Sequence, residues 1–219
     1  LSTALQLLPA DVVKQIGKRH PLLIPPFTNA TLRRAVQDYL AGGDRKKDIV
    51  KKYGEINNWD VSKVTNMKEM FQDDVATTFN QPINKWDVSN VTDMYCMFEN
   101  ANSFNQPLNK WNVSKVTNMG FMFGGATSFN QSLDNWNVSN VKNMECMFSD
   151  TKYFNQPLNN WNVSNVTDMR WMFADAEAFN QPLNKWDVSN VTDMSRMFLR
   201  ADSFNQPLDK WNVSKVTYM

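Results

Sequence analysis

Tryptophan recurs along this chain at a nearly fixed interval, and this interval constrains the fold more than any other feature. After one step of 27 residues the spacing is 25 residues every time, at positions Trp59, Trp86, Trp111, Trp136, Trp161, Trp186 and Trp211. A fixed period of about 20–50 residues indicates a solenoid, in which each unit buries its apolar face only against its neighbours. Such an array offers an extended surface rather than a closed pocket, so the period also argues against an enzyme.

The repeated unit has a consistent pattern of apolar residues. Its consensus reads Leu-x-x-Trp-x-Val-Ser-x-Val-Thr-x-Met-x-x-Met-Phe and ends on Phe-Asn-Gln-Pro. In one copy, the alternation of Trp111 and Val113 predicts a short strand that stacks into a parallel sheet. The spacing of the apolar residues in 119–123 predicts one buried helical turn. We therefore expect residues 56–219 to form a leucine-rich-repeat-like, right-handed solenoid of seven copies, the last one incomplete.

Residues 1–55 lack the repeat and read as a helical N-terminal segment and cap. Their pattern predicts three short helices, over residues 8–16, 30–40 and 44–53. Thr28 or Asn29 can cap the second helix, and glycines end the last two. Because the first unit of a solenoid exposes an apolar edge, we expect these helices to cover it.

One position of the repeat departs from the leucine-rich-repeat pattern. The ninth residue of such repeats is Asn or Cys, whose side chain bonds the backbone of a turn, whereas here it is valine. Buried polar groups of the turn still need partners. We expect a column of asparagines to supply them, aided by the serine two residues before that valine: Asn80, Asn105, Asn130, Asn155, Asn180 and Asn205.

Charge and hydropathy exclude two classes of partner. The net charge is +1, with ten Lys/Arg against five Asp/Glu in residues 1–58 and 13 against 17 in residues 59–219. Neither part has the concentrated basic face of a nucleic-acid-binding protein, so we expect no nucleic acid. No apolar run approaches the ~18–20 residues of a membrane span, so no transmembrane segment is expected. Residues 1–8 are too short and polar for the core of a signal peptide.

The two cysteines, Cys96 and Cys146, occupy the same repeat position two repeats apart. At about 4.8 Å per unit they lie roughly 10 Å apart, beyond the ~7 Å Cα separation that a disulfide tolerates. We expect two free thiols, which mildly favour a reducing, intracellular environment.

The sequence offers no catalytic, cofactor or metal site. His20 is the single histidine, and it stands among prolines without a nucleophile or carboxylate constellation. CxxC, HExxH and phosphate-binding glycine motifs are absent. Asn-x-Ser/Thr motifs recur, but the repeat itself accounts for most of them.

The two positions between the paired methionines vary from copy to copy, unlike their surroundings. If the methionines face inward, these positions face solvent or nearly so. They hold several residues of the types enriched where proteins meet. The candidate interaction face consists of Tyr95, Phe121, Arg170, Trp171 and Arg196.

The phrase Trp-Asp-Val-Ser-Asn-Val-Thr-Asp-Met, followed by Met-Phe and Phe-Asn-Gln-Pro-Leu, resembles the 25-residue repeat of BspA-like leucine-rich-repeat surface proteins. The resemblance covers about residues 44–219. It implies a surface or adhesion protein, at the cell surface or on a virion, with no catalytic residues to carry over.

Two functions remain open. The first is a non-enzymatic module that displays the variable positions to a protein partner. The second is a structural component of a virion or surface layer, assembled through the uncapped C-terminal repeat that ends at Met219.

Overall fold

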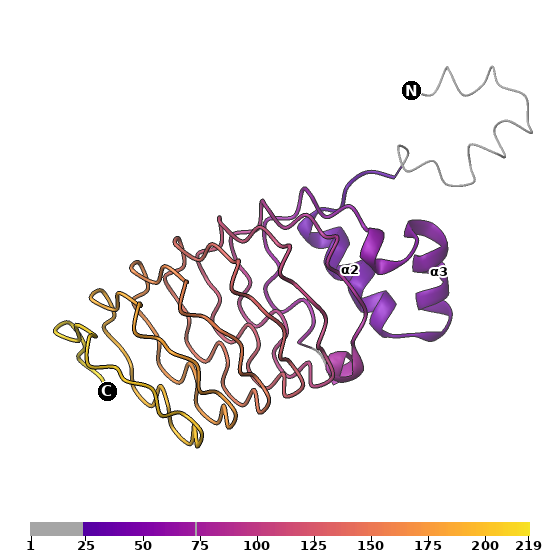
Figure 1. The fold of residues 1–219 in the computed structure, drawn as a ribbon. Coiled ribbons are helices and arrows are strands. Elements are labelled where there is room, and N and C mark those ends of the chain that lie inside the picture. Colours follow the sequence, from indigo (N-terminus) through magenta and orange to yellow (C-terminus); the bar gives the residue numbers. More distant parts are fainter. Residues whose placement is uncertain (1–23, 73) are drawn as a thin grey trace, which may run out of the picture.

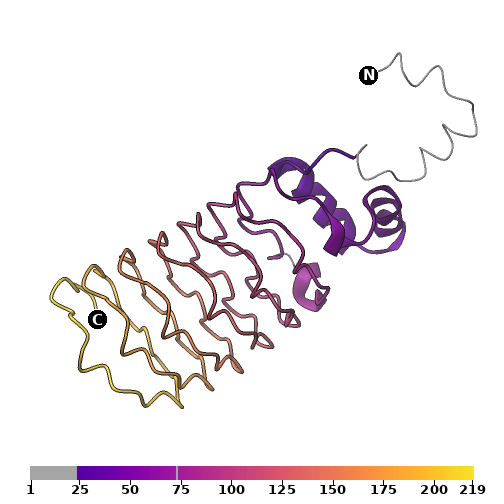
Figure 2. The same ribbon diagram turned by 45° about the horizontal axis from the view of Figure 1, so that its top comes forward.

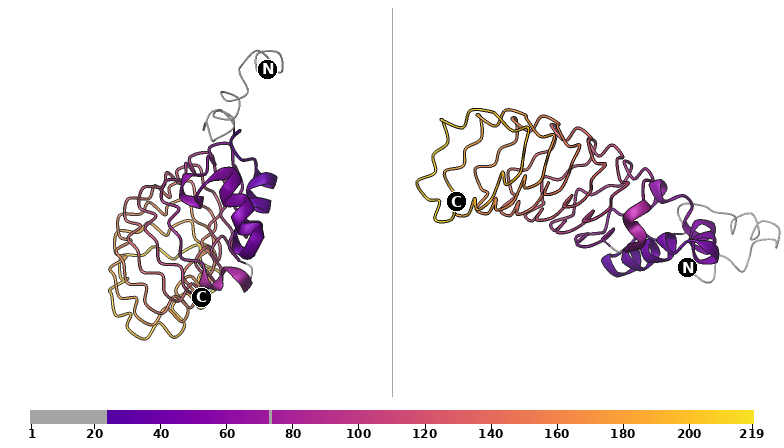
Figure 3. Two further views of the ribbon diagram at one scale, coloured as in Figure 1. Left: turned by 90° about the vertical axis from the view of Figure 1, so that its right-hand side faces the viewer. Right: turned by 90° about the horizontal axis from the view of Figure 1, so that it is seen from below.

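The computed structural model describes residues 24–72 and 74–219. Figure 1 shows a row of similar coils stacked side by side, with two helices at the N-terminal end. The turned views of Figures 2 and 3 show the same arrangement, with the C-terminal coil at the end of the row opposite the helices. Each coil is one 25-residue repeat and is called a rung below. The predicted helix over residues 8–16 and His20 lie outside the described residues.

The two helices lie close to where the sequence predicts them. Helix α2 spans Asn29–Leu40, and the Thr28 side chain accepts a hydrogen bond from the backbone N–H of Thr31 in a capping box. Helix α3 spans Gly43–Tyr53 and ends at Gly54, whose φ of 80° suits glycine. A short 3-10 helix, η3, follows at Ile56–Asn58 and leads into the first tryptophan.

The inner face of the helices packs on the first rung. The Tyr39 ring of α2 meets the Trp59 ring edge-on, with centroids 5.8 Å apart. Phe27, just before α2, lies 5.2 Å from the same indole, and its backbone N–H donates to the carbonyl of Asp60. The helices therefore cover apolar surface that the first rung would otherwise expose to water.

Columns of identical side chains form the core of the solenoid. The indoles of Trp136 and Trp161 stack with centroids 6.4 Å apart and planes 3° apart. Two phenylalanine columns run beside them, and Phe123 of one lies 4.1 Å from Phe129 of the other. From Trp86 onward, the indole Nε1 of each tryptophan in this column donates across the stack, as Trp136 does to the carbonyl of Leu108 in the rung before. The core is thus continuous along the rod, and each rung completes the packing of its neighbours.

The predicted short strand does not form. The part of the chain that the structure describes contains no strands, because the backbone N–H of Trp111 turns back to the carbonyl of Leu108 and that of Val116 to the carbonyl of Val113. The extended segment between these two turns, residues 111–113, is too short to form a ladder of hydrogen bonds between strands. Isolated parallel bridges connect neighbouring rungs at a different position, the residue before the first methionine: Asn66, Asp93, Asn118, Asn143, Asp168, Asp193 and Tyr218.

The predicted helical turn is also wrong. The backbone N–H groups of Met119, Phe121 and Phe123 do not follow the i to i−4 pattern of a helix. They donate instead to carbonyls of the following rung, at Asn143, Glu145 and Met147, over 3.0, 2.7 and 3.0 Å. Stacking places a neighbouring rung within reach of every second N–H, and this satisfies the backbone without a helix.

The asparagine column performs the role predicted for it. The side-chain Oδ1 of Asn130 accepts the backbone N–H of Asn155 and the side-chain Nε2 of Gln156, each over 3.0 Å. The same pair of bonds repeats along the rod. The serines contribute mainly through their main chain, since the N–H of Ser114 donates to the Asn112 side chain and its carbonyl accepts from Asn140.

The first interval, from Trp59 to Trp86, is 27 residues long and therefore has two residues more than the other intervals. These two residues fall where a second 3-10 helix, η4, spans Asp74–Thr78. The stack continues beyond this segment, with the ring centroids of Phe79 and Phe104 5.9 Å apart.

Candidate interaction face

The two residues between the paired methionines lie in register from rung to rung. We call them the variable face: residues 68–69, 95–96, 120–121, 145–146, 170–171 and 195–196. Their backbones are joined by a ladder in which the N–H of Phe121 donates to Glu145 over 2.7 Å and that of Trp171 to Ser195 over 3.0 Å. The face is therefore one continuous stripe along the rod.

Every second residue of the variable face has a left-handed backbone. The φ angles of Phe121, Trp171 and Arg196 are 55°, 57° and 57°. This conformation costs a residue with a side chain roughly 1–2 kcal/mol. The inter-rung hydrogen bonds hold it in place, and it permits the tight turn between the two methionines.

Tyr95 and Phe121 form an aromatic pair on the stripe. Their rings meet edge-on with centroids 5.7 Å apart, and the ammonium group of Lys68 lies 5.2 Å from the Tyr95 centroid. Gly120 makes room for the pair, because a Cβ on this residue would lie 3.1 Å from the Tyr95 ring. Both rings are half-buried and keep part of their surface in contact with water.

A second pair lies three rungs further along. The guanidinium of Arg196 lies 4.9 Å above the centroid of the Trp171 ring. Beside it, the Arg170 Nε lies 2.8 Å from Glu145 Oε1 and 3.4 Å from Asp168 Oδ2. The structure thus brings the predicted residues together as two clusters, an aromatic pair and a group in which two arginines contact a tryptophan and two carboxylates.

One comparison with known proteins gives a match. The sequence model of the family described as "Mycoplasma protein of unknown function, DUF285" matches residues 45–153 and 131–219. The chain belongs to this family. No curated protein and no solved structure matches the chain. The DUF285 match coincides with α3 and the tryptophan rungs, and its description assigns no function.

Two cysteines of this DUF285 chain are placed differently from the prediction. Cys96 and Cys146 are free, as predicted, but both side chains are buried rather than facing solvent. Burial raises the pKa of Cys146 to about 12, with the Glu145 carboxylate adding to the effect. Burial also raises the pKa of Cys96, whose thiol lies beside Glu99. Alkylation must therefore be measured on the unfolded chain, because folded thiols of this kind react slowly.

The described residues contain no group of three His, Cys, Asp or Glu side chains placed to hold a metal ion. No helix in the part of the chain that the structure describes is long and apolar enough to cross a membrane.

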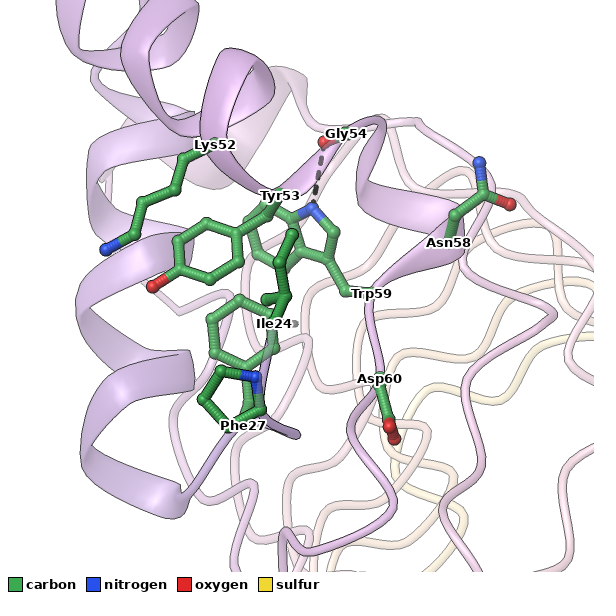
Figure 4. A pocket seen from close by; sticks show the side chains of 9 residues that line it. Ile24, Phe27, Lys52, Tyr53, Gly54, Asn58, Trp59 and Asp60 are labelled. Atoms are coloured by element: carbon green, nitrogen blue, oxygen red, sulfur yellow. Dashed lines mark hydrogen bonds between the residues drawn. The ribbon is translucent and has the colours of Figure 1, made fainter. Parts of the chain in front are cut away.

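The structure adds one candidate that the sequence did not reveal. A cleft of about 310 Å³ lies where the segment before α2, the end of α3 and the first tryptophan meet (Figure 4). Ile24, Phe27, Tyr53 and Trp59 provide its apolar lining. The only sign of this cleft in the sequence is Phe27, because it is the one phenylalanine outside the repeats.

Proposed function

We propose that this chain is a non-enzymatic repeat protein whose variable face binds a protein partner. The observation that carries the proposal is the contrast between two sets of positions. The core columns repeat almost without change, whereas the variable face lies in register, is partly open to water and differs in every rung. A rigid scaffold with one variable surface is suited to recognition.

The residue types on the stripe support this role. Trp, Tyr and Arg are the residues that most often dominate the energy of protein interfaces. Trp171 and Arg196 already contact each other, as do Tyr95 and Phe121. Such packing fixes side chains before a partner arrives, and this lowers the entropy that binding must overcome.

We further propose that the solenoid is a right-handed, leucine-rich-repeat-like coil related to BspA-like surface proteins. The parallel bridges between rungs and the similar consensus support this relation. On this view the chain acts at a cell surface or on a virion, as an adhesion module.

Site-specific photocrosslinking tests the interaction face. A benzoylphenylalanine at position 121 should capture the partner, whereas one at position 110, on an exposed lysine of the same rung, should not. The double variant Phe121→Ala with Trp171→Ala should abolish the capture while lowering the melting temperature by a few degrees at most. Retained binding would move the site to another face, such as the column of Lys85, Lys110 and Lys185. A collapse of stability would assign both aromatics to the core.

A structural role is the second candidate, and the regular stacking of the rungs favours it, because hydrogen bonds of the same kind join each rung to the next along the rod. Sedimentation at micromolar concentration separates the two functions, because a monomer favours the binding module and ordered oligomers favour the structural component.

A further inference from the structure

We propose that the cleft between the helical cap and the first rung binds an acidic peptide of a protein partner. The peptide inserts one apolar side chain into the cleft and places a carboxylate against Lys52. This site is separate from the variable face and does not depend on the role proposed for it.

The floor of the cleft is aromatic. The centroid of the Phe27 ring lies 4.6 Å from that of Tyr53 and 5.2 Å from that of Trp59, and Ile24 lines the same cleft (Figure 4). The volume of about 310 Å³ is at the lower end of the range for ligand pockets. A cleft of this size and lining accepts a single large apolar side chain.

Polar groups at the rim are already engaged within the chain. The Gly54 carbonyl accepts the indole N–H of Trp59 over 3.0 Å, as Figure 4 shows. The Asp60 carboxylate accepts both the N–H and the hydroxyl of Ser62. An entering group therefore gains most from apolar contact with the floor. The Asp60 carboxylate repels a second carboxylate, so the anion of the entering group must lie on the opposite, Lys52 side of the cleft (Figure 4).

Lys52 is the rim group with unused capacity. Its side chain is exposed, and its ammonium lies 4.7 Å from the Tyr53 centroid. Within residues 24–72 and 74–219, no carboxylate lies at ion-pair distance from this ammonium. A cation at the edge of an apolar recess selects a ligand that carries an anion next to an apolar group, because a charge-assisted hydrogen bond then adds to the burial.

A second hollow indicates a peptide rather than a small molecule. It lies between α2 and α3, has a volume of about 380 Å³, and shares Lys52 and Tyr53 with the cleft. The exposed Arg34 lines it and adds a second cation, opposed by Asp38. Two hollows that share two lining residues offer contacts to more than one side chain of a peptide. Helix α3 itself carries five Lys/Arg against two Asp, which complements an acidic segment.

Fluorescence anisotropy with defined probes tests the proposal on the full chain. The probe is a fluorescein-labelled hexapeptide, Glu-Asp-Leu-Phe-Asp-Glu. We expect saturable binding, at least fivefold weaker for the uncharged Gln-Asn-Leu-Phe-Asn-Gln and at least fivefold weaker for Glu-Asp-Ser-Ser-Asp-Glu. The variant Lys52→Glu should weaken binding at least tenfold. Lys51→Glu is the matched control, because Lys51 is exposed on the same helix but lines neither hollow, and it should weaken binding less than twofold.

Three results would overturn the proposal. The first is the absence of saturable binding at millimolar protein. The second is an equal loss in Lys52→Glu and Lys51→Glu, which would mean that only the overall charge of α3 attracts the peptide. The third is NMR contact between the cleft and residues 1–23 in the free protein, which would make the chain's own N-terminal segment the occupant. The Phe121→Ala, Trp171→Ala double variant should bind the probe normally, which keeps this test apart from that of the variable face.

Discussion

In the helical cap the backbone N–H of Leu32 donates to Thr28, four residues earlier, whereas in the solenoid the N–H of Phe123 donates to Met147, twenty-four residues later. The cap therefore uses bonds that form within one short segment. A rung forms its own tight turns, but the N–H groups between these turns donate to the rungs on either side. The same difference separates a helix, which local sequence specifies, from a repeat array, whose stability resides largely in the interfaces between repeats.

The largest effect should come from a tryptophan in the middle of the stack. Trp136→Ala removes a ring that packs against Trp161 and Phe123, together with the bond from Nε1 to the Leu108 carbonyl. We expect a loss of about 3–5 kcal/mol in the free energy of unfolding, measured by urea denaturation. Trp171→Ala, on the variable face, should cost about 1 kcal/mol. Equal losses would show that the core and the variable face are not energetically distinct.

The asparagine column offers the next test, because it connects rungs through side chains. Asn130→Ala leaves the N–H of Asn155 and the amide of Gln156 without their acceptor. We expect a loss of about 2 kcal/mol in the same measurement. The exposed Lys110 has no such role, and Lys110→Ala should stay within about 0.5 kcal/mol of the unchanged chain. If the two substitutions had equally small effects, the column would contribute nothing to stability.

Alkaline pH should destabilise the solenoid through its two thiols. An unfolded cysteine has a pKa of about 8.5, whereas burial raises the pKa of Cys146 to about 12. Between these values the unfolded chain loses a proton that the folded chain keeps. The free energy of unfolding therefore holds below pH ~8.5 and falls as the pH rises, by up to about 1.4 kcal/mol per pH unit for each thiol.

Urea titrations at a series of pH values measure this dependence. The matched variant carries Cys96→Ala and Cys146→Ala, and its slope should be flatter, apart from a contribution of Tyr95, whose pKa is raised to about 12. A parallel slope in this variant would contradict the assignment to the thiols.

The smallest and most local effect should come from the cap. Thr28→Ala removes the capping box of α2 and should cost about 1 kcal/mol. Hydrogen exchange should quicken at the amides of α2 and stay unchanged in the middle rungs, since the bond removed is local. Gln37→Ala, on the exposed side of the same helix, is the control. Faster exchange throughout the array would mean that the cap holds the whole stack together.

The sequence predicts what depends on periodicity or on local capping. The buried tryptophan, methionine and phenylalanine columns follow from the 25-residue period, and the ends of α2 and α3 follow from Thr28 and the glycines. The path of the backbone inside a rung does not follow, because its partners are 24 residues away and come within reach only once the rungs have stacked. The sequence therefore predicts a strand and a helical turn in each repeat. The structure instead has tight turns in these segments, and hydrogen bonds join them to the neighbouring rungs.

The candidate sites show the same limit. The variable face could be located, since a position that changes stands out against a repeating background. The burial of Cys96 could not, because the same repeat position with the same left-handed backbone holds the exposed Arg196, so the position alone does not determine how far a side chain is covered. The cleft at the cap could not be predicted either, because Phe27, Tyr53 and Trp59 belong to three separate segments and meet only in the fold.

The direction of the inter-rung bonds has a mechanical consequence. Because these bonds join successive rungs side by side, tension between the two ends of the chain loads them one rung at a time instead of all together. Each release frees about 25 residues, which is roughly 80–90 Å of extended chain. Under tension the rod should lengthen in equal steps at low force, with one rung released at each step. A single-molecule extension trace with one abrupt rupture would exclude this behaviour.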